Sequence, residues 1–206
     1  MSTEKALAAR PYGANGLTIG GNRAILTDGI HFRMRPAGNA AAGTREGRRC
    51  MAIEKVRAYF ARMGIADRIR EFDVSSATVP LAAAALGCEP CRIAKTLSFM
   101  TDGGPVLIVA AGDVKVDNGK YKAFFKQKAR MLTPQEAETL VGHAVGGVCP
   151  FAVNDGVRVY LDVSLRRFGT VFPACGSGNS AIEMTVAELE KYSGSVAWID
   201  VTKPAV

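Results

Sequence analysis

Residues 93–112 read "IAKTLSFMTDGGPVLIVAAG" and contain two strand signals joined by a turn. Apolar and polar residues alternate over residues 93–101, as in a strand with one buried face. Asp102, Gly103 and Gly104 are residue types that tight turns favour. Residues 105–111 are entirely apolar, which is typical of a strand buried on both faces. The stretch predicts two successive strands, the second of them inside the fold.

Helical and strand signals surround this pair without a strict strand–helix–strand repeat. Ile53, Val56, Phe60 and Met63 recur every three to four residues and predict an amphipathic helix over residues 52–63. Thr78 and Gly87 are suitable caps for a helix between them. This mixture favours an α+β fold with a mixed, mostly antiparallel sheet. Further helices are expected over residues 117–129, 133–140 and 185–193, and strands over 69–75, 130–133, 157–165, 170–176, 180–185 and 196–201.

The first fifty residues differ in composition from the rest. Residues 1–50 carry eight Lys/Arg and three Asp/Glu, whereas residues 51–206 carry 18 and 16. Residues 1–50 are also rich in Gly, Ala and Arg and show little periodicity. We therefore expect residues 1–50 to be a disordered extension or an over-long start assignment, with a basic arm that touches nucleic acid as the alternative. Residues 51–206 are expected to form one compact domain.

Several classes of protein are disfavoured by the sequence. It holds no apolar run of 18 residues, and no secretory signal peptide is apparent, so we expect a cytoplasmic protein without membrane contact. Five cysteines favour free thiols over a disulfide framework. Cys88 and Cys91 have the spacing of a metal or redox pair, but a second pair is lacking. We expect them to lie in a turn, and expect neither a metal nor a cofactor.

Two basic features suggest an anionic ligand. Lys95 lies within an apolar strand, where a buried ammonium group needs a partner such as phosphate; a water-exposed edge strand is the alternative. Residues 120–130, "KYKAFFKQKAR", contain five basic residues with aromatic residues between them. This composition suits a nucleic-acid backbone. Equally, the segment could be an amphipathic helix with Phe124 and Phe125 in the core and its lysines in water.

The glycine-rich loop 142–151, "GHAVGGVCPF", fits neither phosphate-binding pattern that glycine loops commonly follow. It lacks the lysine of a Walker loop and the spacing of a dinucleotide fingerprint. A nucleophile pair formed by Cys149 and His143 is chemically feasible, but no third, orienting group is apparent. The remaining interpretation is a turn whose glycines let a ligand approach the backbone N–H groups.

Five stretches in this order resemble the YbaK/EbsC family: "RIAKTLSF", "PVLIVAAGD", "KARMLTPQEAETLVGHAVGGVCPF", "VYLDVSL" and "VFPACGSGNSAIEMT". Its members are free-standing relatives of the editing domain in bacterial prolyl-tRNA synthetases. The resemblance covers residues 52–202 and implies a sheet curled into a partial barrel flanked by helices. It also implies hydrolysis of the ester between a wrong amino acid and the terminal adenosine of a tRNA, without a cofactor.

The resemblance also assigns roles to residues. Lys95 would engage the nucleotide phosphate or sugar, and the backbone of Gly146 and Gly147 would hold the aminoacyl carbonyl and ribose. Cys149 replaces a serine found in many relatives, so its thiol is not required as a nucleophile. The other residues expected at the substrate are Thr78, Thr96, His143, Val148, Cys149, Pro150, Gly176, Ser177, Gly178 and Asn179. The residues expected to bind tRNA are Lys120, Lys122, Lys126, Lys128 and Arg130.

Two functions therefore remain open. The first is a trans-editing deacylase that removes a small amino acid such as Cys, Ala, Ser or Thr from tRNA. Some relatives have Asn where this chain has Thr96, which leaves the amino acid open. The second is a catalytically inactive module that binds tRNA or an aminoacyl-tRNA synthetase. Lys95 together with an intact glycine loop favours the deacylase, whose partners would be aminoacyl-tRNA and a synthetase.

Overall fold

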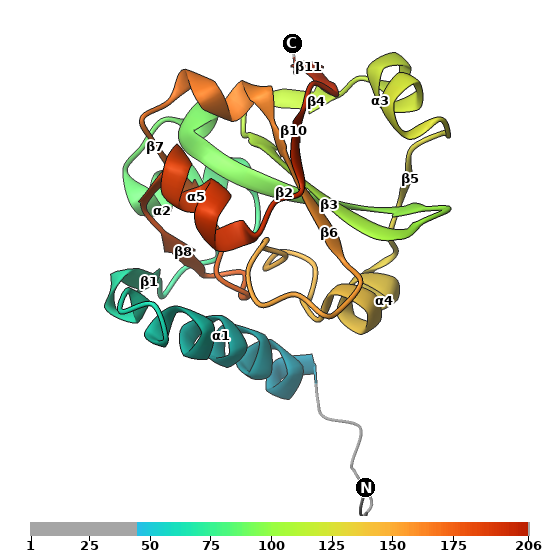
Figure 1. Cartoon of the computed structure of the whole chain (residues 1–206). Helices are drawn as coiled ribbons and strands as arrows, with labels where there is room; N and C mark the ends of the chain where they lie inside the picture. Colours follow the sequence, from blue (N-terminus) through green and yellow to red (C-terminus); the bar gives the residue numbers. More distant parts are fainter. Residues whose placement is uncertain (1–44, 206) are drawn as a thin grey trace, which may run out of the picture. The chain divides into compact units, whose positions relative to one another are not determined.

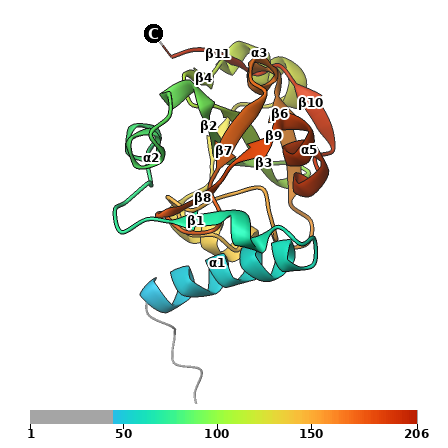
Figure 2. The ribbon, with the colours of Figure 1, turned by 90° about the vertical axis from the view of Figure 1, so that its left-hand side faces the viewer.

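A computed structural model describes residues 45–205 (Figures 1 and 2). The helices are α1 (Arg45–Ala61), α2 (Val79–Leu86), α3 (Asn118–Phe125), α4 (Pro134–Glu136) and α5 (Val186–Ser193). Short helical turns lie at Ala66–Arg68, Pro90–Arg92, Ala137–Val141 and Val163–Arg167. The strands are β1 (Ile69–Glu71), β2 (Ile93–Thr101), β3 (Gly104–Ala111), β4 (Val114–Val116), β5 (Arg130–Met131), β6 (Arg158–Asp162), β7 (Thr170–Pro173), β8 (Ser180–Ile182), β9 (Met184–Thr185), β10 (Ala197–Ile199) and β11 (Thr202–Pro204).

The central sheet has the strand order β10-β6-β3-β2-β7-β9, with β5 paired to β2. β2 and β3 form the expected antiparallel pair, which closes at Thr101 and Gly104. β3 pairs with β6, β6 with β10, and β2 with β7 in parallel. The pairings β1–β8, β4–β11 and β7–β9 are antiparallel. The predicted mixed, mostly antiparallel α+β fold is thus confirmed.

The two faces of β2 meet different parts of the protein. Ala94 packs into the larger core, which includes residues of α1 and α5 and the side chains of Cys149 and Phe151. On the other face, Phe99 packs against Tyr121 of α3. Ile93, also on that face, packs against the alanines of α2. Because side chains alternate along a strand, Lys95 shares this second face and lies along β2 between the α2 and α3 contacts.

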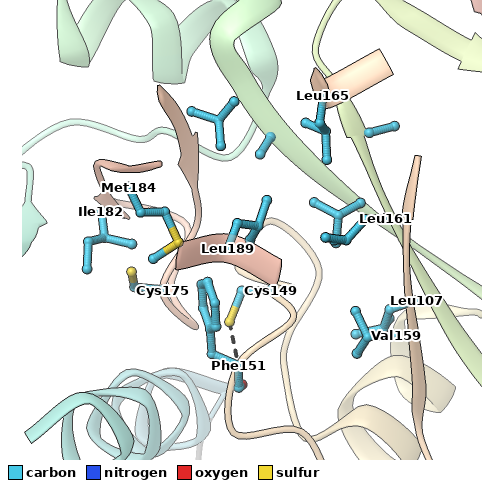
Figure 3. Close-up of a cluster of buried hydrophobic side chains, with 14 of the residues drawn as sticks. Leu107, Cys149, Phe151, Val159, Leu161, Leu165, Cys175, Ile182, Met184 and Leu189 are labelled. Carbon is cyan, nitrogen blue, oxygen red and sulfur yellow. Dashed lines mark hydrogen bonds between the residues drawn. The ribbon is translucent and has the colours of Figure 1, made fainter. Parts of the chain in front are cut away.

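The larger core closes over the glycine-rich loop from several directions. Figure 3 shows Cys149 and Phe151 among side chains of the β8–β9 region, α5 and the central strands. Phe60 of α1 is fully buried and its ring lies 4.8 Å from that of Phe151, centroid to centroid. In both views α1 lies at one end of the domain and α3, with β4 and β11, at the other.

The structure corrects several expected boundaries. α1 begins at Arg45, before residue 52, because helix-compatible residues extend it beyond its apolar face. α3 ends at Phe125, since Lys126 adopts a left-handed conformation with φ 61°. The expected strand over residues 69–75 ends at Glu71. The expected extension over residues 1–50 falls largely on residues 1–44, which lie outside the described part of the chain.

None of the helices between residues 45 and 205 combines the length and the apolar character that crossing a membrane requires.

Candidate functional site

Two segments that are distant in sequence, residues 72–78 and 175–180, come together beside the glycine-rich loop. The amide of Ser76 donates to the carbonyl of Gly178 at 2.7 Å, and the amide of Phe72 donates to the carbonyl of Asn179 at 2.8 Å. The Asn179 side chain returns a bond from Nδ2 to the carbonyl of Phe72 at 3.0 Å. We call residues 175–180 the late turn, and we call residues 72–78, 142–149 and 175–180 together the glycine-turn site.

Glycine at position 147 is required by contact between two turns. A Cβ atom added to Gly147 would lie 2.7 Å from the carbonyl carbon and oxygen of Gly176 and from Cα of Ser177. A Cβ on Gly146, whose φ is +95°, would lie 3.0 Å from Cβ of Ala77. The sequence suggested that a side chain at Gly147 would intrude on a ligand. The structure gives a different reason, since it would strike the backbone of the late turn.

Helix α1 supports this contact from behind. Gly176 has a φ of +88°, and a Cβ added there would lie 2.8 Å from the carbonyl oxygen of Ala52. Ala52 and its neighbour Ile53 are buried. The late turn is therefore held between α1 on one side and Gly147 on the other.

Some amide groups of the glycine-rich loop donate hydrogen bonds within the protein, and others do not. The amide of Gly147 donates to the carbonyl of Ala144 at 3.0 Å, and that of Cys149 donates to Nδ1 of His143 at 3.3 Å. The amides of Gly146 and Val148 donate to no acceptor in the described part of the chain. The two backbone donors that flank Gly147 are thus not used by hydrogen bonds within residues 45–205.

His143 and Cys149 form a buried, neutral pair. Both side chains are fully buried, and the Cys149 sulfur lies 3.6 Å from His143 Nδ1. Burial raises the pKa of the Cys149 thiol to about 12 and lowers the pKa of His143 to about 4. At neutral pH neither group is charged, so the pair lacks the thiolate that a cysteine nucleophile needs.

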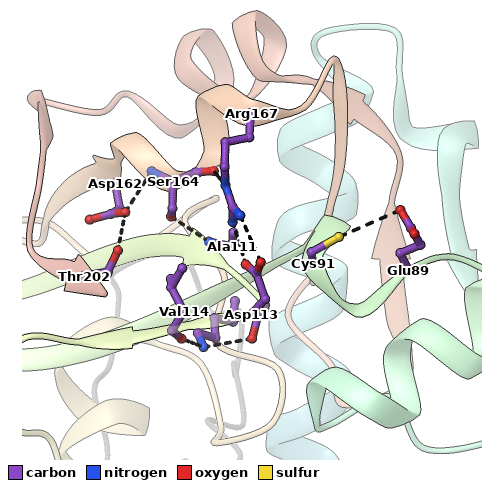
Figure 4. A network of polar contacts seen from close by, with 11 residues as sticks. Glu89, Cys91, Ala111, Asp113, Val114, Asp162, Ser164, Arg167 and Thr202 are labelled. Atoms are coloured by element: carbon purple, nitrogen blue, oxygen red, sulfur yellow. Dashed lines mark hydrogen bonds and ion pairs between the residues drawn. The ribbon is translucent and has the colours of Figure 1, made fainter. Parts of the chain in front are cut away.

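Lys95 is held by backbone oxygens. Its side chain is partly buried, and Nζ donates to the carbonyl of Gly112 at 3.1 Å and to that of Val114. Burial lowers the pKa of Lys95, an effect that Asp113 opposes. The Asp113 carboxylate is itself paired with Arg167, with oxygen–nitrogen distances of 2.6 and 3.0 Å (Figure 4). An ammonium group has three protons, so one donor of Lys95 remains unassigned.

The N-terminal end of α2 lies between Lys95 and the glycine turns. Gly112, which binds Lys95, is packed so closely that an added Cβ would lie 2.8 Å from the side chain of Val79. Ala77, two residues before Val79, contacts Gly146 and would contact a Cβ on Gly178 at 3.4 Å. Lys95 and the glycine turns therefore border the same helix end without a direct contact between them.

The remaining predicted substrate residues take several positions. Thr78 caps α2, accepting a bond from the amide of Leu81. The hydroxyl of Thr96 is buried without a partner in residues 45–205. Ser177 donates to Asn179 and bonds to Ser180, which stabilises the late turn. Val148 is partly buried and Pro150 is buried. Sequence reasoning missed Ala77, whose only signal was a run of small residues before Thr78.

The basic run divides into paired and unpaired residues. Lys120 is paired with Asp200 at 2.7 Å, and Arg130 with Glu136 at 3.1 Å. Lys122, Lys126 and Lys128 are exposed and have no carboxylate partner in the described chain. Phe124 is 47% exposed, so the alternative interpretation that placed it in the core is wrong for this residue. It lies on the surface because α3 turns Tyr121 inward instead.

The cysteine pair and the cavity near β1 and β9 do not form a functional site in the described part of the chain. Cys88 and Cys91 are free thiols in a turn, and no set of three or more His, Cys, Asp or Glu residues placed to bind a metal occurs between residues 45 and 205. A cavity of about 470 Å³ lies near β1 and β9. Its main charged groups pair with each other, including Arg68 with Glu188 at 2.8 Å, and Arg92 at the edge of the same cluster pairs with Glu183 at 3.3 Å.

The sequence and the fold are similar to those of known proteins. The family model for the aminoacyl-tRNA editing domain matches residues 74–192. The uncharacterized protein YwhH of Bacillus subtilis is 53% identical over 154 residues, which are 74% of this chain and 98% of YwhH. A proline–tRNA ligase of Thermotoga maritima is 35% identical over 82 residues, 39% of this chain and 14% of the ligase. A crystal structure of a candidate trans-editing enzyme for prolyl tRNA synthetase has a TM-score of 0.67 and 29% identity, covering 74% of this chain and 97% of its own.

Gly147→Ala should destabilise the protein, because the added methyl group meets backbone atoms that cannot rotate away. We expect the free energy of unfolding to fall by about 1–3 kcal/mol, the usual cost of overpacking. Urea unfolding measures it. Gly169→Ala is the matched control, since a Cβ there meets nothing within 4 Å. Equal stability of the two variants would contradict the turn–turn contact.

Stability should also fall in mild acid because of His143. The pKa of His143 is about 4 in the folded protein, below its ordinary value of 6.5, so the unfolded chain binds more protons between these values. The stabilisation is complete above pH 6.5, and about 2 kcal/mol of it should be lost by pH 5. The buried neighbour Cys149, whose pKa is about 12, stays neutral over this range, and the other group that acts on the ring is the side chain of Lys55 in α1. Urea unfolding at pH 7.5 and pH 5 measures the loss, which His143→Asn should largely remove.

Proposed function

The chain belongs to the family of aminoacyl-tRNA editing domains, and from this we propose that it is an aminoacyl-tRNA deacylase that removes wrongly attached amino acids from tRNA. The observation that carries the proposal is the pair of unengaged amides at Gly146 and Val148, on a loop that the protein holds rigidly. The reaction class is the hydrolysis of a carboxylic ester.

The backbone would stabilise the charge that develops during hydrolysis. Water adds to the aminoacyl carbon, and the carbonyl oxygen becomes negative before the ribose oxygen leaves with a proton. Amides of Gly146 and Val148 would donate to that oxygen. Donors fixed before the reaction need no reorganisation, and loss of one such donor typically costs about 10²–10³-fold in rate.

Lys95 would place positive charge beside the nucleotide. Its ammonium group is anchored by the carbonyls of Gly112 and Val114, and no carboxylate among residues 45–205 pairs with it directly. The third proton can therefore contact a phosphate or ribose oxygen of the terminal adenosine. Burial disfavours the charged form of Lys95, and an anionic ligand bound beside it would favour that form again.

A covalent route through Cys149 fits the site poorly. The thiol is fully buried and its pKa is about 12, so almost no thiolate exists at neutral pH. Water is therefore the nucleophile in the proposed reaction. We propose that a hydroxyl of the substrate's own ribose assists it, because His143 and Cys149, the titratable residues of the glycine-rich loop, are buried and neutral.

The substrate would be a tRNA that carries a small amino acid such as Cys, Ala, Ser or Thr. Similarity to a segment of proline–tRNA ligases supports an aminoacyl-tRNA synthetase as a second partner. The alternative is an inactive module that binds tRNA or the synthetase. Retention of Lys95 with the glycine turns favours the enzyme.

The surface of α3 and the residues after it would bind the body of the tRNA. Lys122, Lys126 and Lys128 are exposed and unpaired within residues 45–205, and Phe124 is exposed beside them. Phe99 and Lys95 lie on the face of β2 that α3 covers. The unpaired lysines would therefore extend the positive charge from Lys95 along one side of the protein.

Lys95→Ala should lower deacylation while leaving the fold intact. We expect kcat/KM to fall at least about tenfold, which corresponds to about 1.4 kcal/mol of transition-state stabilisation. A panel of tRNAs charged with Cys, Ala, Ser, Thr and Pro measures the rate and identifies the amino acid. Lys115→Ala is the matched control, because Lys115 is exposed on β4 and bonds to the carbonyl of Ala205. No deacylation of any tRNA by the unaltered protein would favour the inactive module.

Replacing Lys122, Lys126 and Lys128 together by alanine should weaken tRNA binding and reduce its salt dependence. Each phosphate contact contributes about one unit to the slope of log affinity against log salt concentration, so the slope should decrease by up to about three. Binding titrations at several salt concentrations measure it. The double variant Lys120→Ala/Arg130→Ala is the control, since those charges are paired with carboxylates. An unchanged slope in the triple variant would place the tRNA elsewhere.

A further inference from the structure

His143 occupies an unusual place for a polar residue. Its side chain is fully buried, yet Nε2 has no partner in the described part of the chain. Nδ1 accepts the amide hydrogen of Cys149 at 3.3 Å. Because an accepting nitrogen carries no proton, the neutral ring holds its proton on Nε2. A buried donor without an acceptor costs free energy, so packing alone does not explain a histidine here.

The bond from Cys149 to His143 closes the glycine-rich loop into a ring. It joins the residues on either side of the segment 144–148. Within the ring, the amide of Gly147 donates a hydrogen bond to the carbonyl of Ala144 at 3.0 Å. The amides of Ala144, Val145, Gly146 and Val148 donate to no acceptor among residues 45–205, and those of Gly146 and Val148 flank Gly147. The His143 side chain therefore anchors the amide of Cys149, at the end of the segment that carries the amides of Gly146 and Val148.

Full burial keeps His143 itself away from a ligand. An imidazole that is 0% exposed touches no substrate, so the direct substrate contact expected from the sequence does not suit this position. The groups that face it are Cys149 on its own loop and Lys55 on α1. Neither supplies a carboxylate that would turn the ring into a general base.

We propose that His143 is a positioning residue, whose imidazole accepts the Cys149 amide and thereby fixes the free amides of Gly146 and Val148 toward the aminoacyl carbonyl. This inference rests on the proposed deacylase function. It assigns to His143 an effect on the rate of the chemical step rather than on the affinity for tRNA.

The test compares replacements that place an acceptor near Nδ1, near Nε2 or nowhere. In His143→Asn, Oδ1 stands near the position of Nδ1 and can accept the Cys149 amide. In His143→Gln the oxygen stands near Nε2, and in His143→Leu no acceptor remains. We expect His143→Leu and His143→Gln to lower kcat by about 10²-fold, as misplacement of donors does, with KM changed less than about threefold. His143→Asn should recover most of the rate.

Tyr121→Phe is the matched control, because it also removes a fully buried polar atom without a partner, but in α3. Its kcat should be unchanged. Equal rates for His143→Asn and His143→Gln, or an unaltered kcat in a folded His143→Leu protein, would overturn the proposal. If His143→Leu fails to fold, the Asn and Gln pair still decides, since both are neutral amides.

A readout that is independent of activity separates this inference from the proposed function. Amide hydrogen exchange followed by nuclear magnetic resonance reports the Cys149 N–H directly. Slow exchange in the unaltered protein and in His143→Asn, with fast exchange in His143→Gln, supports the positioning role even if no mischarged tRNA is hydrolysed. Fast exchange in the unaltered protein refutes it, whatever the enzyme does.

Discussion

The backbone contact between Gly147 and Gly176 is the constraint on which the candidate site depends. Two turns that are almost thirty positions apart in the chain approach until no Cβ fits between them. Gly176 is held in turn against the carbonyl of Ala52, so α1 is part of the same stack. Such a stack has no flexible side chains at its centre. It can therefore hold amides in place more rigidly than a loop that is packed through long side chains.

The sheet gives this stack its second component. β2 presents Ala94 to the core beneath the glycine loop and Lys95 to the opposite face, where α2 and α3 pack. Gly112 and Val79 connect that face to the end of α2, and Ala77 connects the end of α2 to Gly146. The N-terminal end of the short helix α2 thus lies between Lys95, on one face of the sheet, and the amides of the glycine-rich loop. Because side chains alternate along β2, the strand that places Ala94 in the core also places Lys95 on the opposite face, away from the loop amides.

Local signals predicted much of the fold, and long-range contacts explain what they missed. The β2–β3 pair and helix α2 with its caps Thr78 and Gly87 were readable because their determinants lie within a few residues. The pairing of β4 with β11 was not, since it joins three-residue strands from distant parts of the chain. Likewise, the run of basic residues gave no hint that Asp200 neutralises Lys120 while Lys122 stays free. The site followed the same rule: Gly146, Gly147 and Gly176 were expected from the sequence, but the contact between their turns and the place of Ala77 depend on tertiary packing.

Burial explains why this site would work through its backbone. In many hydrolases a histidine and a cysteine near a glycine loop would be the reactive pair. Here His143 and Cys149 are buried in the core. Desolvation disfavours the charged form of each, with a pKa of about 4 for His143 and about 12 for Cys149. What remains at the surface of the loop is a set of peptide dipoles, whose strength does not vary with pH. A site of this kind would discriminate by where it places a carbonyl, and it would leave proton transfer to water and to the substrate.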